Sequence, residues 1–177
     1  MGDKDAASLT QGLPVNPNDI IKAAYRIRQF VPKSPLDYSP RLSKLYGAEL
    51  FLKKEHLSLT GSYKERGALN KMMSLSDAEK QRGVVCSSAG NHAQAVSHHS
   101  TRLGINSVIV MPESTPFVKV AATQNFGGTV VLHGERWDWG IEFDLVQERT
   151  MTKLMQKLWR LQSLKEGHLF ILSMTLL

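Results

Sequence analysis

One lysine, Lys64, has the surroundings that best suit it to covalent chemistry. It lies in the run TGSYKERGA over residues 60–68. The spacing of Ser62 and Glu65 predicts a capping box, which places Lys64 in the first turn of a helix. An ammonium there meets the positive end of the helix dipole, and Arg66 adds a second positive charge nearby. Both effects favour the neutral amine, the nucleophilic form. The alternative is a solvated lysine at a surface helix end.

A second run, SSAGNHAQ over residues 87–94, directly follows an apolar segment and opens another predicted helix. Its small residues let the backbone approach a ligand closely, and free amides at a helix start favour an anion. Ligands of α/β folds bind at the carboxyl ends of parallel strands, so this run predicts a site for an amino-acid carboxylate. A plain tight turn explains the run equally well, with Asn91 as N-cap and Gln94 as its capping-box partner.

Other catalytic motifs are missing from the sequence. It contains neither the GxGxxG dinucleotide fingerprint nor the GxxxxGK[ST] phosphate loop. The histidines at 92, 98 and 99 lack the i, i+4 spacing of a helical zinc pair, so the sequence predicts no metal site. His98 and His99 are expected to form a polar helix face. Cys86 belongs to an apolar run and is expected to be part of the core.

Alternating strand and helix patterns surround both runs. Residues 1–35 are expected to form an N-terminal arm and a helix capped by Asn18, and residues 36–43 a loop. The predicted strands are 49–53, 83–87, 106–111 and 129–132, and the predicted helices are 62–75, 91–103 and 116–126. Short β-branched runs separated by helical patterns are typical of a parallel sheet with crossover helices. The predicted fold class is therefore α/β.

The composition fits one such domain and excludes several kinds of partner. The chain has 177 residues, 42% of them hydrophobic and 21% charged, which is enough for one core. A single cysteine fits a reducing compartment. The net charge of +6 is not clustered as in nucleic-acid binders, and the most apolar stretch, residues 169–177, is too short to cross a bilayer. We expect a cytoplasmic protein without nucleic-acid or membrane partners.

In their order and spacing, the two runs resemble those of the pyridoxal-phosphate (PLP) enzymes of the tryptophan-synthase-β fold (fold type II). Within that group the sequence looks like the threonine/serine dehydratases, or ammonia-lyases, and their relative serine racemase. The matching runs are LKKEHL at 52–57, GSYKERGA at 61–68, SAGNHAQ at 88–94, VMP at 110–112, FGG at 126–128 and LHG at 132–134. The resemblance implies a three-layer parallel-sheet PLP fold, with residues 36–134 as an incomplete enzyme domain. It also implies conversion of L-threonine or L-serine to a 2-oxo acid and ammonia.

The same resemblance implies a role for each residue of the two runs. Lys64 would bind PLP covalently and remove the substrate α-proton, Tyr63 would pack beside the PLP ring, and Asn91 would donate a hydrogen bond to the pyridine 3′-oxygen. The substrate carboxylate would be bound by Ser88, Ala89, Gly90, Asn91 and His92. The preference between threonine and serine stays open, and a full-length form could be a homo-oligomer.

Two positions separate the dehydratases from serine racemase. In the racemase, the residue before the Gly-Asn pair is a serine that acts as acid and base on the opposite face of the substrate. Here this residue is Ala89, which has no exchangeable proton, and Leu59 stands where the racemase has a nucleotide-binding lysine. Both departures favour the dehydratase.

The sequence changes character after Gly134. All three tryptophans lie in residues 135–177, which hold six basic and six acidic residues, so the whole net charge belongs to residues 1–134. In a shifted frame, codons permitted for residues 149–177 can spell text typical of the family. We therefore expect residues 135–147 to be inserted or unspliced, and the rest a frameshifted translation, in a truncated product. A divergent amphipathic helix is the alternative for this tail.

The family's glycine-rich phosphate loop and its partner of the pyridine nitrogen have no counterpart in this sequence. A catalytically inactive fragment that acts only as a binding partner is therefore a second functional hypothesis beside the enzyme.

Overall fold

The computed structural model describes residues 15–133 and 170–171. Its elements are α2 (Pro17–Ile27), β1 (Leu36–Tyr38), α3 (Pro40–Tyr46), β2 (Phe51–Lys53), the 3₁₀ helix η1 (Glu55–Leu57), α4 (Lys64–Met73), α5 (Asp77–Arg82), β3 (Val84–Ser87), α6 (Asn91–Arg102), β4 (Ser107–Met111), α7 (Phe117–Asn125), β5 (Thr129–Leu132) and β6 (Phe170–Ile171). None of the helices described is both long enough and apolar enough to cross a membrane. The predictions for residues 1–14 and for most of residues 135–177 lie outside the described residues.

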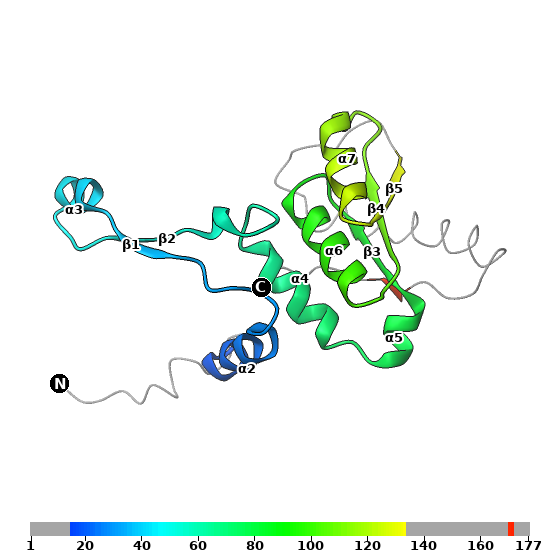
Figure 1. Cartoon of the computed structure of the whole chain (residues 1–177), viewed down its shortest axis with the longest axis horizontal. Coiled ribbons are helices and arrows are strands. Elements are labelled where there is room, and N and C mark those ends of the chain that lie inside the picture. The colour runs from blue at the N-terminus through cyan, green and yellow to red at the C-terminus, as the bar shows by residue number, and fades with distance from the viewer. Residues whose placement is uncertain (1–14, 134–169, 172–177) are drawn as a thin grey trace.

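A four-stranded sheet in the order β5-β4-β3-β6 organises the larger part of the structure. All three of its strand pairs are parallel. Helix α6 connects β3 to β4 and α7 connects β4 to β5; because crossovers of one hand advance the chain in one direction, both helices lie on the same face. Figure 1 shows α4 beside them on that face. The predicted α/β class with a parallel sheet is confirmed.

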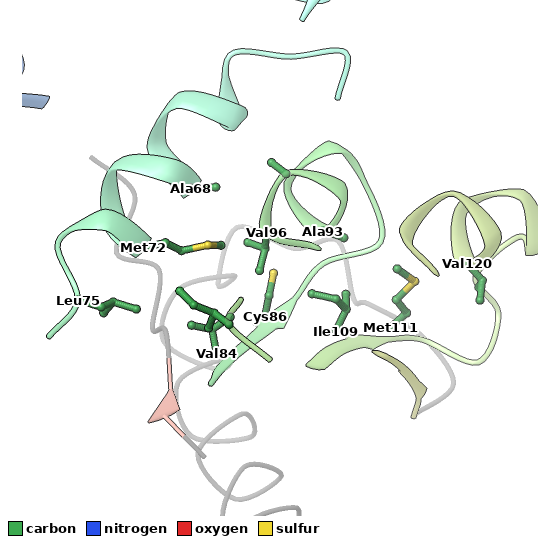
Figure 2. Close-up of a cluster of buried hydrophobic side chains, with 12 residues drawn as sticks. Ala68, Met72, Leu75, Val84, Cys86, Ala93, Val96, Ile109, Met111 and Val120 are labelled. Carbon is green, nitrogen blue, oxygen red and sulfur yellow. The ribbon is translucent and has the colours of Figure 1, made fainter. Parts of the chain in front are cut away.

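The core lies between this helical layer and the two central strands. Figure 2 shows side chains from α4, α6 and α7 meeting side chains from β3 and β4: Ala68, Met72, Ala93, Val96, Val120, Val84, Cys86, Ile109 and Met111. Val85, Val108 and Val110, which alternate with these strand residues, are also at most 8% exposed. Burial on both faces explains the continuous β-branched runs, and it holds the carboxyl end of β3, where the second run begins, on a rigid support.

The structure differs from the sequence prediction at its smaller elements. The predicted strands and central helices are present within two residues at each end. The prediction of a loop over residues 36–43 is wrong, because β1 pairs antiparallel with β2 and α3 follows it. Every side chain of β1 and β2 is exposed, so these strands carry no alternating pattern. Helix α5 was also missed; its signal was the capping box formed by Ser76 and Glu79.

The N-cap of the first helix lies two residues before the predicted one. Asn16, not Asn18, is the N-cap of α2, and its side chain accepts a hydrogen bond from the backbone N–H of Asp19 at 3.2 Å. The Asp19 carboxylate accepts one in return from the Asn16 N–H, and Pro17 occupies the first helical position, where no N–H is needed.

Gly128 packs too closely against α6 to tolerate a side chain. A Cβ atom there would lie 2.2 Å from Ser97 Oγ and 2.9 Å from Ser97 Cβ, and the Ser97 side chain is fully buried. We expect Gly128→Ala to destabilise the fold by about 1–3 kcal/mol, the usual range for overpacking, as measured by urea unfolding. Gly67→Ala is the matched control, because no described atom lies within 4 Å of a Cβ built there. Equal stability of the two variants would contradict the packing argument.

Candidate active site

Lys64 opens α4 as predicted, but the capping box expected around it does not form. Tyr63 is the N-cap. Its backbone angles are already helical, and its side chain makes no capping hydrogen bond. Ser62 Oγ accepts a hydrogen bond from the Lys64 N–H at 3.2 Å. The Glu65 carboxylate instead turns inward and accepts hydrogen bonds from the N–H and Oγ1 of Thr60, at 3.2 and 3.3 Å. Glu65 is 3% exposed, and its hydrogen bonds to Thr60 join the preceding loop to the helix. They thereby fix the position of Lys64, the residue before Glu65.

A charged network anchors the same turn to the loop that follows α2. Arg66 donates two hydrogen bonds to the Glu55 carboxylate, at 2.9 and 3.1 Å, and Ser34 Oγ donates a third at 2.6 Å. The hydrogen bond from Arg66 is the main cause that lowers the pKa of Glu55. The charge of Arg66 is therefore balanced by Glu55, which removes the basis for the sequence argument that Arg66 repels the Lys64 ammonium.

The second run opens α6 without a side-chain cap. Gly90 is the N-cap, and its N–H donates to Ser88 Oγ at 3.4 Å. The alternative with Asn91 as N-cap is wrong, since Asn91 is the first helical residue. Its side-chain Nδ2 donates a hydrogen bond to the carbonyl of Gly61 at 3.4 Å. Asn91 thereby links the second run to the loop that precedes Lys64, although 30 positions separate the two residues.

The charge of Lys64 acts on two residues at the end of β3 and the start of α6. Burial, followed by the Lys64 charge, lowers the pKa of His92 to about 4, so its ring is neutral near pH 7. Burial raises the pKa of the Cys86 thiol to about 12, against the effect of Lys64. Cys86 is 5% exposed and belongs to the core cluster, which confirms the prediction of a core thiol. Lys64 therefore lies near the carboxyl end of β3, where the second run begins.

Comparison with known proteins agrees with this arrangement. The profile of the family described as pyridoxal-phosphate dependent enzyme matches residues 27–159. The chain belongs to this family. Over 130 residues the chain is 47% identical to the catabolic L-threonine dehydratase of Escherichia coli. The match covers 73% of this chain and 40% of the relative. The match of the profile extends past Gly134, into residues that the sequence analysis set apart.

Two solved structures have the same fold as the part of the chain that they match. Serine racemase from Dictyostelium discoideum superposes with a TM-score of 0.68 at 32% identity, covering 87% of this chain and 45% of that one. The processed form of threonine deaminase isoform 2 from Solanum lycopersicum gives 0.64 at 34% identity, covering 81% and 39%. The chain thus spans less than half the length of each of these relatives.

The residues of the two runs fit a PLP group in this PLP-family chain. Lys64 supplies a half-buried primary amine, and Asn91 an exposed amide on the neighbouring helix start. A Cβ built at Gly61, Gly67 or Gly90 meets no described atom within 4 Å, so the backbone is open at these points. The buried Nδ1 of His92 has no hydrogen-bond partner in the described part of the chain. An amine, an amide and an uncapped helix start suit an aldehyde, a ring oxygen and a carboxylate.

The remaining predicted site residues lie near Lys64 and the start of α6. Ser88, Ala89 and Gly90 are half-buried between β3 and α6, and His92 is 9% exposed. Tyr63 is 61% exposed, so its expected packing beside the PLP ring stays a prediction. The second run follows β3 at its carboxyl end, as the sequence predicted, and the hydrogen bond from Asn91 to Gly61 brings the first run beside it.

Sequence reasoning missed a buried polar cluster behind Lys64. His99, expected on a polar helix face, is fully buried, and its Nε2 lies 3.7 Å from Glu65 Oε1. That expectation is wrong because α4 packs on this face of α6. Burial, then the charge of His98, lowers the pKa of His99 to about 4, while Glu65 opposes the shift. The sequence offered one signal of this cluster, the carboxylate of Glu65, and it was interpreted as part of a capping box.

Proposed function

We propose that this chain carries the catalytic-lysine region of a PLP-dependent L-threonine/L-serine ammonia-lyase. The observation that carries the proposal is the placement of Lys64 and the uncapped start of α6 on one edge of the sheet, linked by the hydrogen bond from Asn91 to Gly61. The 47% identity to an L-threonine dehydratase supports the same activity. We also propose a cytoplasmic location, an amino-acid substrate and no nucleic-acid or membrane partner.

The described residues divide the work of such a reaction. When bound, PLP would supply an electron sink that stabilises negative charge at the substrate α-carbon. Lys64 Nζ would remove the α-proton, for which its amine must be neutral. Asn91 would orient the ring through its side-chain amide. The segment from Ser88 to His92 would bind the substrate carboxylate through the backbone N–H groups of Ala89, Asn91 and His92, because a helix start without a side-chain cap leaves N–H groups free for an anion. The other two amides are engaged, since the Ser88 N–H donates to the Val110 carbonyl and the Gly90 N–H to Ser88 Oγ.

Ala89 supports elimination over racemisation. A racemase must both remove and return a proton, which calls for a second group on the opposite face of the substrate. The methyl group of Ala89, half-buried before Gly90, can neither donate nor accept a proton. Loss of the β-hydroxyl as water, followed by hydrolysis, releases a 2-oxo acid and ammonia and needs no such group.

Incubation of the purified chain with PLP, then with L-threonine or L-serine, tests this function. We expect visible absorption from lysine-bound PLP, and release of ammonia and 2-oxo acid in equal amounts. The same samples are assayed for D-serine, whose formation would favour the racemase. A folded chain that binds PLP but releases no ammonia would instead support the inactive fragment that acts as a binding partner.

We propose in addition that the reading frame changes after Gly134. The proposal rests on the codons permitted for residues 149–177, which in a shifted frame can spell text typical of the family, and on the tryptophan and charge distribution of residues 135–177. Sequencing of the transcript tests it, and an uninterrupted family-like frame through this region would refute it.

A further inference from the structure

Three potential metal ligands meet between α4 and α6, behind the turn that carries Lys64. They are Glu65 from α4 and His98 and His99 from α6, and one ligand atom of each lies within 4.8 Å of the others. Glu65 is 3% exposed and His99 is fully buried, whereas His98 is half-buried. Sequence spacing along one helix gave no reason to expect a site here, since the third ligand comes from another helix.

The His99 ring has unused nitrogen atoms in this cluster. Neither Nδ1 nor Nε2 has a hydrogen-bond partner among the described residues, although the side chain is completely buried. The 3.7 Å from Nε2 to Glu65 Oε1 is too long for a hydrogen bond. A buried polar atom without a partner costs free energy, so an additional ligand for this ring would be stabilising.

The Glu65 carboxylate is held in a way that suits a ligand. Its Oε2 accepts both hydrogen bonds from Thr60, while Oε1 faces His99. The His98 and His99 rings lie with their centroids 4.8 Å apart. Arg102 also acts on His99, but its guanidinium donates to the Phe30 carbonyl at 3.0 Å and lies over the Phe30 ring. Its charge is therefore engaged outside the cluster.

We propose that Glu65, His98 and His99 bind a divalent transition-metal ion, with Zn²⁺ as the best match. Two imidazoles and one carboxylate form a well-known zinc ligand set that leaves a fourth position for water. Tetrahedral bonds of about 2.1 Å place ligand atoms about 3.4 Å apart, so the present separations, which reach 4.8 Å, must close by up to about 1.4 Å. His98 is the least enclosed of the three ligands, because it is half-buried with its ring edge-on to that of Phe126, and it would make most of this movement. The hydrogen bonds from Thr60 orient Glu65 from behind.

Metal binding here would join α4 to α6 beside the catalytic lysine. Glu65 directly follows Lys64, so fixing its carboxylate also fixes the first turn of α4. The site needs no contact with PLP or substrate. Its existence can therefore be tested separately from the proposed lyase activity.

The test uses the whole 177-residue chain without PLP, titrated with Zn²⁺ in competition with a chromogenic chelator. We expect one Zn²⁺ per chain at this site, and a d–d absorption spectrum of tetrahedral geometry when Co²⁺ replaces it. His98→Gln and His99→Gln should each weaken binding by at least about tenfold, and Thr60→Val by about tenfold, the usual effect of an outer-shell change. His56→Gln is the matched control, because His56 is exposed on η1 and outside the cluster.

His98→Gln is the decisive variant, because its half-buried side chain can change without leaving a buried charge, and circular dichroism checks its fold. Absence of Zn²⁺ binding by the unaltered chain would overturn the proposal. So would equal affinity in the unaltered chain and in folded His98→Gln, which would assign binding to other residues.

Discussion

Replacement of Lys64 by alanine is expected to abolish covalent attachment of PLP to this chain. A methyl group cannot condense with an aldehyde, and among the described residues Lys64 is the lysine whose charge acts on His92 at the start of α6. Borohydride reduction of the PLP-treated chain, followed by peptide mapping, measures the attachment. The unaltered chain should carry the label on Lys64. If ammonia release is measurable, kcat should fall by at least about 100-fold in the variant, since the same amine serves as base.

Lys71→Ala provides the matched control for this experiment. Lys71 lies in the last turn of the same helix, two turns from Lys64, and is exposed. Its loss should leave labelling at Lys64 unchanged. Labelling of the unaltered chain at another lysine, or at none, would contradict the assignment of Lys64 together with the mechanism that depends on it.

The central strands and the helices between them could be predicted because each is marked by a pattern in its own residues. The β-branched runs of β3 and β4 are buried on both faces, and continuous hydrophobicity is the pattern that such burial requires. Glycines after α6 and α7, at Gly104 and Gly127, end the helices with positive φ angles of 67° and 90°. The hairpin of β1 and β2 could not be predicted in this way. Its side chains are exposed, so pairing alone defines it.

The cluster around His99 was beyond sequence reasoning for a different reason. The pattern Ser62-x-x-Glu65 has the spacing of a capping box, and local geometry gives no ground to reject it. Only the packing of α4 on α6 turns Glu65 inward to Thr60 and covers His99. Such contacts depend on helices that the chain brings together from positions 34 residues apart, which no short pattern encodes.

Acidification is expected to destabilise the fold through His92. Its pKa is lowered from 6.5 to about 4, by burial first and by the Lys64 charge second. Between these values the unfolded chain binds a proton that the native chain excludes, so stability is lost as the pH falls from 6.5 to about 4. At about 1.4 kcal/mol per pH unit, the total loss from this residue is about 3 kcal/mol. Below pH 4 both states are protonated, and this contribution stays constant.

Urea unfolding at a series of pH values measures this loss, with His92→Gln as the test variant. Its stability should fall less between pH 6.5 and 4 than that of the unaltered chain, because glutamine does not titrate. His99, whose pKa is also lowered to about 4, remains in both proteins, so their difference isolates His92. His56→Gln, altered at an exposed histidine, should keep the full pH dependence. Parallel pH profiles for the unaltered chain and His92→Gln would show that the buried ring does not exclude the proton, and that Lys64 does not act on the start of α6.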